Sequence, residues 1–143
     1  MTVGSARWLI DVCLPREGYS ALDAVHASDF ARVPGPAGLR DAQRLKRTLV
    51  TCAEEFRGPC ALRLDHSGVV VFETAPANGA EVARNLQHLE FRIQQYEGGL
   101  VLANNRFLVK SDRELYVIGA DGSERELEPW REVHMQLSPT VAV

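Results

Sequence analysis

The chain has 143 residues, of which 45% are hydrophobic and 24% charged, and its 16 basic and 19 acidic side chains give a formal net charge of −3. This composition is typical of a globular domain, and it excludes a disordered chain, a collagen-like repeat and a strongly basic nucleic-acid coat protein. No apolar run approaches the roughly 20 residues that a membrane-spanning helix needs. We expect one domain over residues 1–143, because two domains would each be too small to bury much core.

Residues 8–14 alternate between the two sides of an extended chain and predict a first strand, which Pro15 ends because proline donates no ladder hydrogen bond. Ser20 and Asp23 resemble a helix capping box. This pattern predicts a short helix over residues 21–28.

Residues 39–57 carry the first strong helical pattern of the chain. Their apolar stripe, with positions at i, i+4, i+7 and i+11, consists of Leu45, Leu49, Cys52 and Phe56. Because Cys52 belongs to this stripe, we expect its thiol to be buried and unreactive. A reactive thiol needs a basic and partly exposed setting.

Residues 61–75 predict a hairpin whose second strand, over residues 69–72, is apolar on both faces and therefore central in a sheet. A second strong helix follows. Asn78 is placed to cap it, and Glu81, three residues later, is placed to reach back to the amide of the cap. Apolar residues then repeat at helical spacing as far as Tyr96.

The pattern beyond the second helix is one of antiparallel strands. Turns at Asn104-Asn105 and Asp121-Gly122 predict two hairpins, and a last strand is expected over residues 133–137. The elements thus predict an α+β fold, an antiparallel sheet covered on one face by two amphipathic helices, with the ferredoxin-like order β-α-β-β-α-β. Residues 1–110 would form this core unit, and residues 111–143 would add a hairpin, a strand and a loose tail.

The three cysteines, Cys13, Cys52 and Cys60, form no C-x-x-C pair, so the sequence signals neither a zinc knuckle nor a thioredoxin-type redox motif. The first residues lack a basic segment, and Asp11 interrupts the apolar residues that follow, unlike a signal peptide. A reducing cytoplasm is therefore the expected location, and no metal or cofactor is expected.

The common nucleotide, zinc-protease, hydrolase and calcium-binding motifs do not occur in the sequence. Adjacent residues on a strand point to opposite faces, so Asp65-His66-Ser67 does not form a catalytic triad by itself and is better explained as a polar turn. A small enzyme remains an alternative. Its site would converge from loops that carry Asp65, His66, His134 and Cys60.

Arginines recur on one face of the predicted first helix, at Arg40, Arg44 and Arg47. Such a stripe is typical of a solvated face, but it also suits the carboxylates of an acidic protein partner or the phosphates of a nucleic acid. The net charge of −3 argues against nucleic acid, because phosphate contacts dominate that affinity.

Phe91 is an apolar residue on the polar face of the predicted second helix, about 180° from Val82 on the helical wheel. Its polar neighbours on that face are Arg84, Gln87, His88 and Gln95. Two explanations stand side by side. The C-terminal strands or tail cover Phe91 within the chain, or Phe91 anchors a protein–protein contact with these neighbours as its polar rim.

The missing catalytic motifs, the acidic balance and Phe91 favour a non-catalytic interaction protein in the cytoplasm. It would dock a helix face on another protein or on its own copy. Compact acidic accessory proteins of bacteria or phages, such as inhibitors, immunity proteins and assembly components, have this general character.

Overall fold

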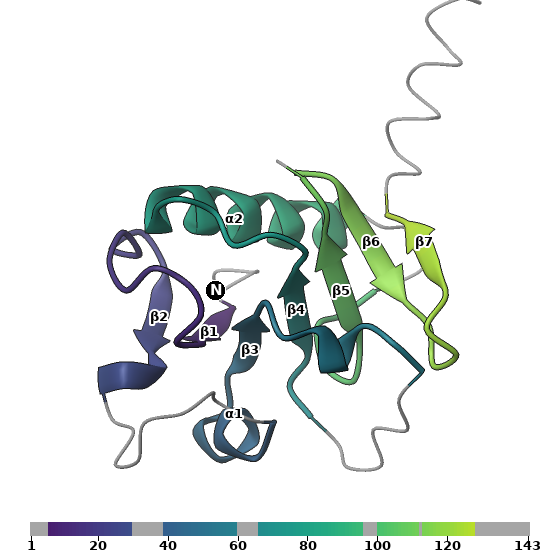
Figure 1. Ribbon diagram of the computed structural model, residues 1–143, viewed down its shortest axis with the longest axis horizontal. Helices are drawn as coiled ribbons and strands as arrows, with labels where there is room; N and C mark the ends of the chain where they lie inside the picture. The colour runs from purple at the N-terminus through teal and green to yellow at the C-terminus, as the bar shows by residue number, and fades with distance from the viewer. Residues whose placement is uncertain (1–5, 30–38, 60–65, 96–99, 112, 128–143) are drawn as a thin grey trace, which may run out of the picture.

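The computed structural model describes residues 6–29, 39–59, 66–95, 100–111 and 113–127, and seven short strands of this part of the chain form one sheet (Figure 1). In chain order they are β1 (Arg7–Ile10), β2 (Asp23–His26), β3 (Thr48–Thr51), β4 (Val69–Phe72), β5 (Arg106–Val109), β6 (Leu115–Ile118) and β7 (Glu124–Glu126). Their order in the sheet is β2-β1-β3-β4-β5-β6-β7. The first five run parallel to one another, and β6 and β7 continue the sheet in antiparallel fashion.

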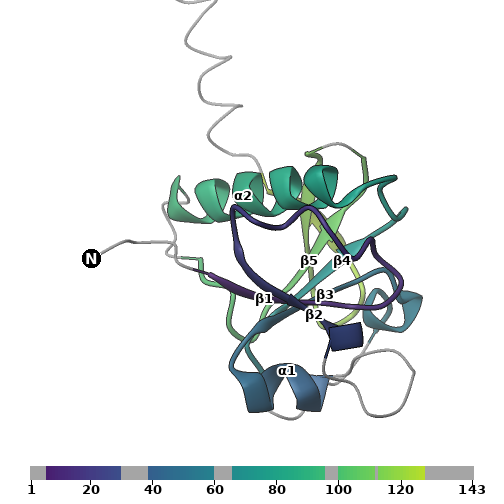
Figure 2. The ribbon, with the colours of Figure 1, turned by 90° about the vertical axis from the view of Figure 1, so that its left-hand side faces the viewer.

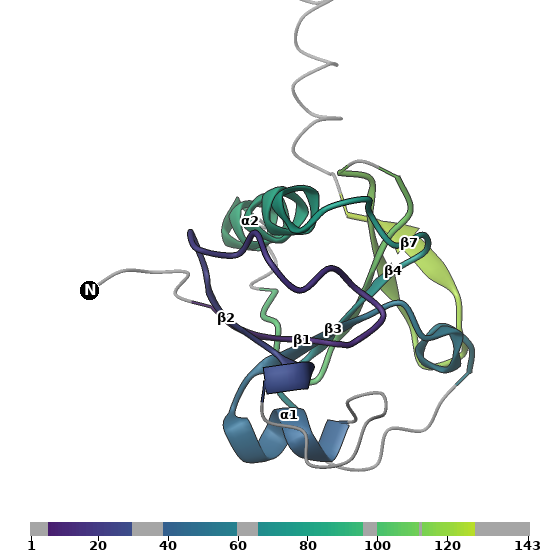
Figure 3. The same cartoon turned by 60° about the vertical axis from the view of Figure 1, so that its left-hand side comes forward.

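The two α-helices lie on opposite faces of this sheet (Figures 2 and 3). Helix α2 (Gly79–Gln95) packs on the face that carries Trp8, Val70 and Phe107. The other face carries Leu9 and Leu49 among others, and it is covered by α1 (Leu39–Leu45) and by the short 3-10 helix η2 (Glu54–Phe56). No helix in the described residues is long and apolar enough to cross a membrane.

The predicted combination of helices and a sheet is therefore confirmed, but its arrangement is not. The expected antiparallel, ferredoxin-like sheet with both helices on one face is wrong for the described strands. The physical reason lies in the strands themselves, because β3 and β4 are buried along their whole length on both faces. Strands of this kind belong to parallel sheets, which need a cover on each side.

The helix predicted over residues 21–28 is replaced by the edge strand β2 and by a second 3-10 helix, η1 (Ala27–Asp29). Asp23 does not act in a helix cap. Its carboxylate pairs with Arg7 of the neighbouring strand at 3.5 Å and with Arg47 at 2.8 Å. These ion pairs fix the start of β2 beside β1.

The long helix predicted over residues 39–57 is also wrong, because α1 ends at Leu45. Lys46 takes a left-handed conformation with φ 57°, and its amide donates to the carbonyl of Gln43 at 3.1 Å. The amide of Arg47 donates to the carbonyl of Ala42 at 2.9 Å. This pair of bonds is the Schellman arrangement that closes a helix. The β-branched residues that follow then form β3.

The second helix and the last hairpin agree with the prediction. The side chain of Asn78 accepts the amide hydrogen of Glu81 at 3.0 Å, which caps α2 as predicted. The Glu81 carboxylate accepts from the side-chain amide of Asn78 at 3.3 Å, whereas the prediction placed it on the backbone amide of the cap. Strands β6 and β7 pair around a turn in which Gly122 has φ 87°, a value that side chains rarely adopt.

The remaining strand predictions have mixed outcomes. Strand β4 is central as expected, but it lies parallel to β3, and the first strand of its predicted hairpin lies outside the described residues. Asn104 makes the expected turn with φ 62°, yet residues 100–103 form no strand. The strand expected over residues 133–137 also lies outside the described residues.

Candidate functional site

The carboxyl ends of β1 and β3 meet at one edge of the sheet. The two strands are parallel neighbours, with Ile10 opposite Val50, and the amide of Asp11 extends their pairing by donating to the carbonyl of Val50 at 2.8 Å. Strand β1 lies between β2 and β3. The chain therefore goes from β1 to β2 on one side of it and then returns to β3 on the other side. In open sheets with parallel strands, ligands bind outside the carboxyl ends at such a reversal of strand order.

Asp11 is a buried acidic residue of this edge, with 1% of its surface exposed. Its carboxylate accepts hydrogen bonds from the amide of Val12 at 2.7 Å and from Oγ1 of Thr51 at 2.6 Å. A buried carboxylate is costly unless donors compensate for its lost hydration. These bonds therefore both stabilise the charge and fix its direction.

Two cysteines follow the ends of these strands and are paired as a disulfide. The Cα atoms of Cys13 and Cys52 are 6.4 Å apart, within the range that a disulfide spans. Cys13 is exposed and Cys52 is half-buried. The amide of Cys52 donates to Sγ of Cys13 at 3.1 Å, and that sulfur lies 3.8 Å from Oγ1 of Thr51 and 4.0 Å from Oδ2 of Asp11.

This arrangement overturns the expectation that Cys52 lies buried on the apolar stripe of a helix. That expectation depended on a helix through residues 39–57, and the residue instead follows a strand that ends beside Asp11. The sequence signals for the pair are weak, because Cys13 and Cys52 are 39 positions apart and only the adjacency of β1 and β3 brings them together.

Short contacts hold the loop that carries Cys13. Leu14 is buried, with 3% of its surface exposed, and its amide donates to the carbonyl of Asp11 at 3.1 Å. Nε2 of His26 lies 3.0 Å from the carbonyl of Leu14 and therefore carries the hydrogen of that bond. The hydroxyl of Tyr19 donates to the carbonyl of Pro15 at 2.5 Å, and burial raises the pKa of Tyr19 to about 12, which keeps this donor protonated.

A pocket of about 300 Å³ lies farther along the same edge, at the ends of β4 and β5 and the start of α2. Its polar lining includes Thr74, Glu81, Asn85, Lys110 and Ser111. The ammonium of Lys110 pairs with the Glu124 carboxylate at 2.8 Å, and Arg57 pairs with the same carboxylate at 3.1 Å. Among the described residues, none of the side chains predicted as site residues lines this pocket.

The predicted docking residues on α2 stand where the helical wheel puts them. Phe91 is 50% exposed, whereas Val82, Leu86 and Leu89 on the opposite side of the helix are fully buried. Of the predicted rim, Arg84, Gln87 and Gln95 are exposed and His88 is half-buried. Half of the surface of Phe91 is thus exposed in the described structure. The tail that might also have covered it, residues 128–143, lies outside the described residues.

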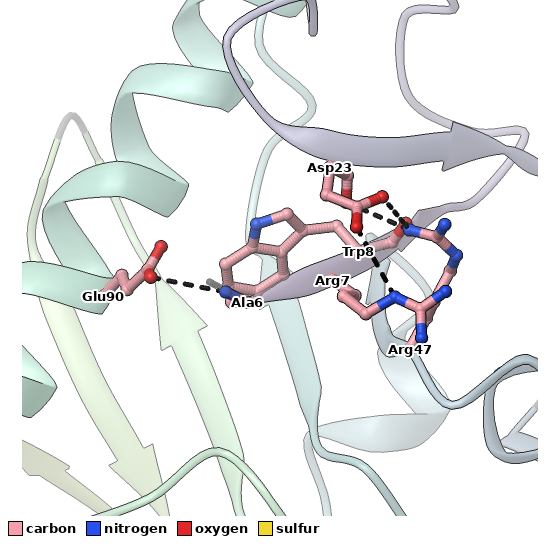
Figure 4. Close-up of polar contacts among 6 residues, drawn as sticks. All are labelled: Ala6, Arg7, Trp8, Asp23, Arg47 and Glu90. Carbon is pink, nitrogen blue, oxygen red and sulfur yellow. Dashed lines mark hydrogen bonds and ion pairs between the residues drawn. The ribbon is translucent and has the colours of Figure 1, made fainter. Parts of the chain in front are cut away.

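The predicted stripe of three arginines does not form. Arg40 and Arg44 are exposed on α1, where Arg44 pairs with Asp41 at 3.4 Å. Arg47 lies beyond the end of that helix, and only 11% of its side chain is exposed. Its guanidinium donates to the carbonyl of Trp8 at 3.3 Å and to the Asp23 carboxylate at 2.8 Å (Figure 4). Arg47 therefore joins β1, β2 and β3 within the fold.

Of the four residues of the alternative enzyme site, only His66 belongs to the part of the chain that the structure describes. Cys60, Asp65 and His134 lie outside the described residues. His66 is buried at the amino end of β4, where its Nδ1 accepts the amide hydrogen of Gly68 at 3.0 Å, in agreement with the interpretation as a turn. Among the described residues, no group of three or more His, Cys, Asp and Glu side chains is placed to hold a metal ion.

A comparison with protein-family models gave no match, and neither did comparisons with curated proteins and with solved structures. A proposal of function for this chain therefore depends on the geometry of its described residues.

Proposed function

We propose that this chain is a non-catalytic docking module of the cytoplasm, which binds another protein through the outer face of α2. The observation that carries the proposal is the half-exposed Phe91 on a helix whose opposite face buries Val82, Leu86 and Leu89. Aromatic anchors with a polar rim are typical of the centres of protein interfaces.

The energy available from Phe91 is sufficient to matter. A phenylalanine side chain buries roughly 200 Å² when fully covered, so the exposed half corresponds to about 100 Å². At about 25 cal/mol per Å², covering this area contributes about 2.5 kcal/mol. Such a contribution equals a factor of roughly 60 in the dissociation constant.

The chemistry of the rim favours a different protein over a second copy of this chain. The rim contributes the cationic Arg84 and the titratable His88, together with the amides of Gln87 and Gln95. In a symmetric dimer through this face, each copy would present the same cationic and neutral rim, and both copies carry a net charge of −3. A complementary partner offers an apolar pocket for the ring, bordered by carboxylates.

Site-specific photo-crosslinking in cells of the source organism tests this proposal. The photoreactive residue benzoylphenylalanine is placed at position 91, and in a matched control it is placed at Gln43, an exposed polar position on α1. We expect a discrete adduct with one other protein from position 91 and none from position 43. The further change Arg84→Glu should weaken the adduct by tenfold or more, because it reverses the charge of the rim.

Three results would overturn the proposal. They are the same adducts from both positions, no adduct from position 91, and an adduct of twice the mass of this chain. The last result would establish self-association in place of a different partner, and sedimentation velocity of the purified protein measures it independently.

A further inference from the structure

A second feature of the fold, on the carboxyl edge of β1 and β3, points to chemistry that docking through α2 does not use. Cys13 and Cys52 lie at the switch in strand order, where ligands reach open sheets of this kind. We infer that Cys13 and Cys52 form a reversible thiol–disulfide site whose co-reactant is a low-molecular-weight thiol.

Accessibility is the first argument. Cys13 is exposed and the residue before it, Val12, keeps 41% of its surface in solvent, so a small solute reaches the sulfur from outside. Exposed disulfides are the labile and regulatory ones, whereas structural disulfides resist reduction. In a reducing cytoplasm, the disulfides that do form are usually transient.

The polar surroundings of Cys13 are the second argument. The amide of Cys52 points at Sγ of Cys13 from 3.1 Å, which stabilises the negative charge on that sulfur when it leaves the mixed disulfide in the second step of the exchange. Oδ2 of Asp11 lies 4.0 Å from the same sulfur, where it would accept a hydrogen bond from the thiol after reduction. Thr51 holds this carboxylate at 2.6 Å, so Asp11 and Thr51 act as positioning residues.

The reaction is a thiol–disulfide exchange that consumes two molecules of thiol. The thiolate of the first attacks Sγ of Cys13, and the electron pair of the bond between the cysteines leaves on Sγ of Cys52. The thiolate of the second attacks the small-molecule sulfur of this mixed disulfide, and the electron pair returns to Sγ of Cys13. The two protons released by the small thiols end on the two cysteines. The protein disulfide is thereby reduced, and the two small thiols are oxidised to one disulfide.

Glutathione and its disulfide serve as the probe in the test. The folded protein carrying Cys60→Ser, which removes the third cysteine, is equilibrated in mixtures of reduced and oxidised glutathione. Acid quenching, alkylation and mass spectrometry then measure the fraction of Cys13–Cys52 disulfide. We expect one reversible transition, reached from the oxidised and from the reduced protein alike.

Two outcomes of this titration would overturn the inference. A pair that stays oxidised in excess reduced glutathione until urea unfolds the chain is a structural crosslink. A pair that stays reduced in excess oxidised glutathione forms no disulfide site.

Single variants test which sulfur is attacked. Cys52→Ser leaves Cys13 without its partner, so we expect oxidised glutathione to form a mixed disulfide on Cys13. We expect the corresponding adduct on Cys52 in Cys13→Ser to form at least tenfold more slowly, because Cys52 is less exposed. Equal rates, or a faster reaction at Cys52, would contradict the assignment of Cys13 as the attacked sulfur. Circular dichroism verifies that both variants are folded, and the glutathione titration does not depend on them.

Discussion

Arg106 is the side chain whose removal tests the packing of the fold most directly. It begins β5 with only 4% of its surface exposed, and its guanidinium donates to three carbonyls. The acceptors are Phe56 at 2.8 Å, Gly58 at 2.7 Å and Gly119 at 2.5 Å. One cation thus joins the η2 segment to β5 and to the turn between β6 and β7.

The cost of Arg106→Met depends on the fate of each carbonyl after its donor is lost. Gly58 and Gly119 are half-buried, so water replaces their lost bonds at a net cost of about 1 kcal/mol each. The bond to Phe56 is buried, and an unsatisfied buried acceptor costs about 1–3 kcal/mol. The total is about 3–5 kcal/mol, a large fraction of the 5–15 kcal/mol that stabilises a typical domain.

Urea denaturation followed by circular dichroism measures this change in the free energy of unfolding. Arg125→Met is the matched control, because Arg125 is exposed on β7, and its loss should change stability by less than about 0.5 kcal/mol. Arg106→Lys keeps the charge but loses the planar fork of donors, so we expect it to recover only part of the loss. The reasoning is refuted if Arg106→Met costs less than about 1 kcal/mol, or no more than the control.

Two further predictions concern α2 and the salt bridges at the carboxyl edge. Asn78→Ala removes the cap of α2 and should cost about 1 kcal/mol, a fall of about 2–4 °C in Tm by thermal circular dichroism, whereas Asn78→Asp should retain most of the stability. An equal loss in both variants would contradict the role of the cap. The hydrogen bond from Lys110, and then that from Arg57, hold the pKa of Glu124 below its ordinary value of 4.5. This stabilisation is complete above pH 4.5 and is lost as the pH falls through the lowered value, so Glu124→Gln should flatten the acid side of the stability profile. An unchanged acid limb in the variant would refute this linkage.

The parts of the fold that the sequence predicted are those with local causes. The start of α2 depends on Asn78 and Glu81, which are three residues apart, and the outward position of Phe91 follows from the pitch of one helix. The turn at Gly122 likewise lies within a single hairpin. In each case the residues that decide the structure are neighbours in the chain.

The end of α1 was missed because the decisive residue is unusual. Lys46 takes the left-handed conformation that closes the helix. The residue at this position is usually glycine, and a glycine in the sequence would have indicated the end of the helix. Without that signal, Leu45 and Leu49 fit a continuing helical stripe as well as they fit a helix followed by a strand. As a result, Cys52, which follows the end of β3, was predicted on the face of a helix.

The parallel pairing of β1 and β3 was out of reach for a different reason. Their register joins Trp8 to Thr48 across 40 positions, so no residues close together in the sequence indicate that these two strands are neighbours. The site at Asp11, Cys13 and Cys52 could not be predicted for the same reason, because it exists only where the ends of these two strands meet.

Asp11 gives a reason to regard that edge as more than structural. A carboxylate with 1% of its surface exposed loses its hydration, and the hydrogen bonds that it accepts mainly offset that loss. An apolar side chain in its place would leave the Thr51 hydroxyl and the Val12 amide without the acceptor that they bond here. The carboxylate is also fixed 4.0 Å from Sγ of Cys13, so the thiol–disulfide exchange proposed for Cys13 gives it a second role beside its hydrogen bonds. The variant Asp11→Asn distinguishes a role in the chemistry of Cys13 from a role in packing. It should alter the rate of glutathione adduct formation on Cys13 in the Cys52→Ser protein, with little change in the free energy of unfolding.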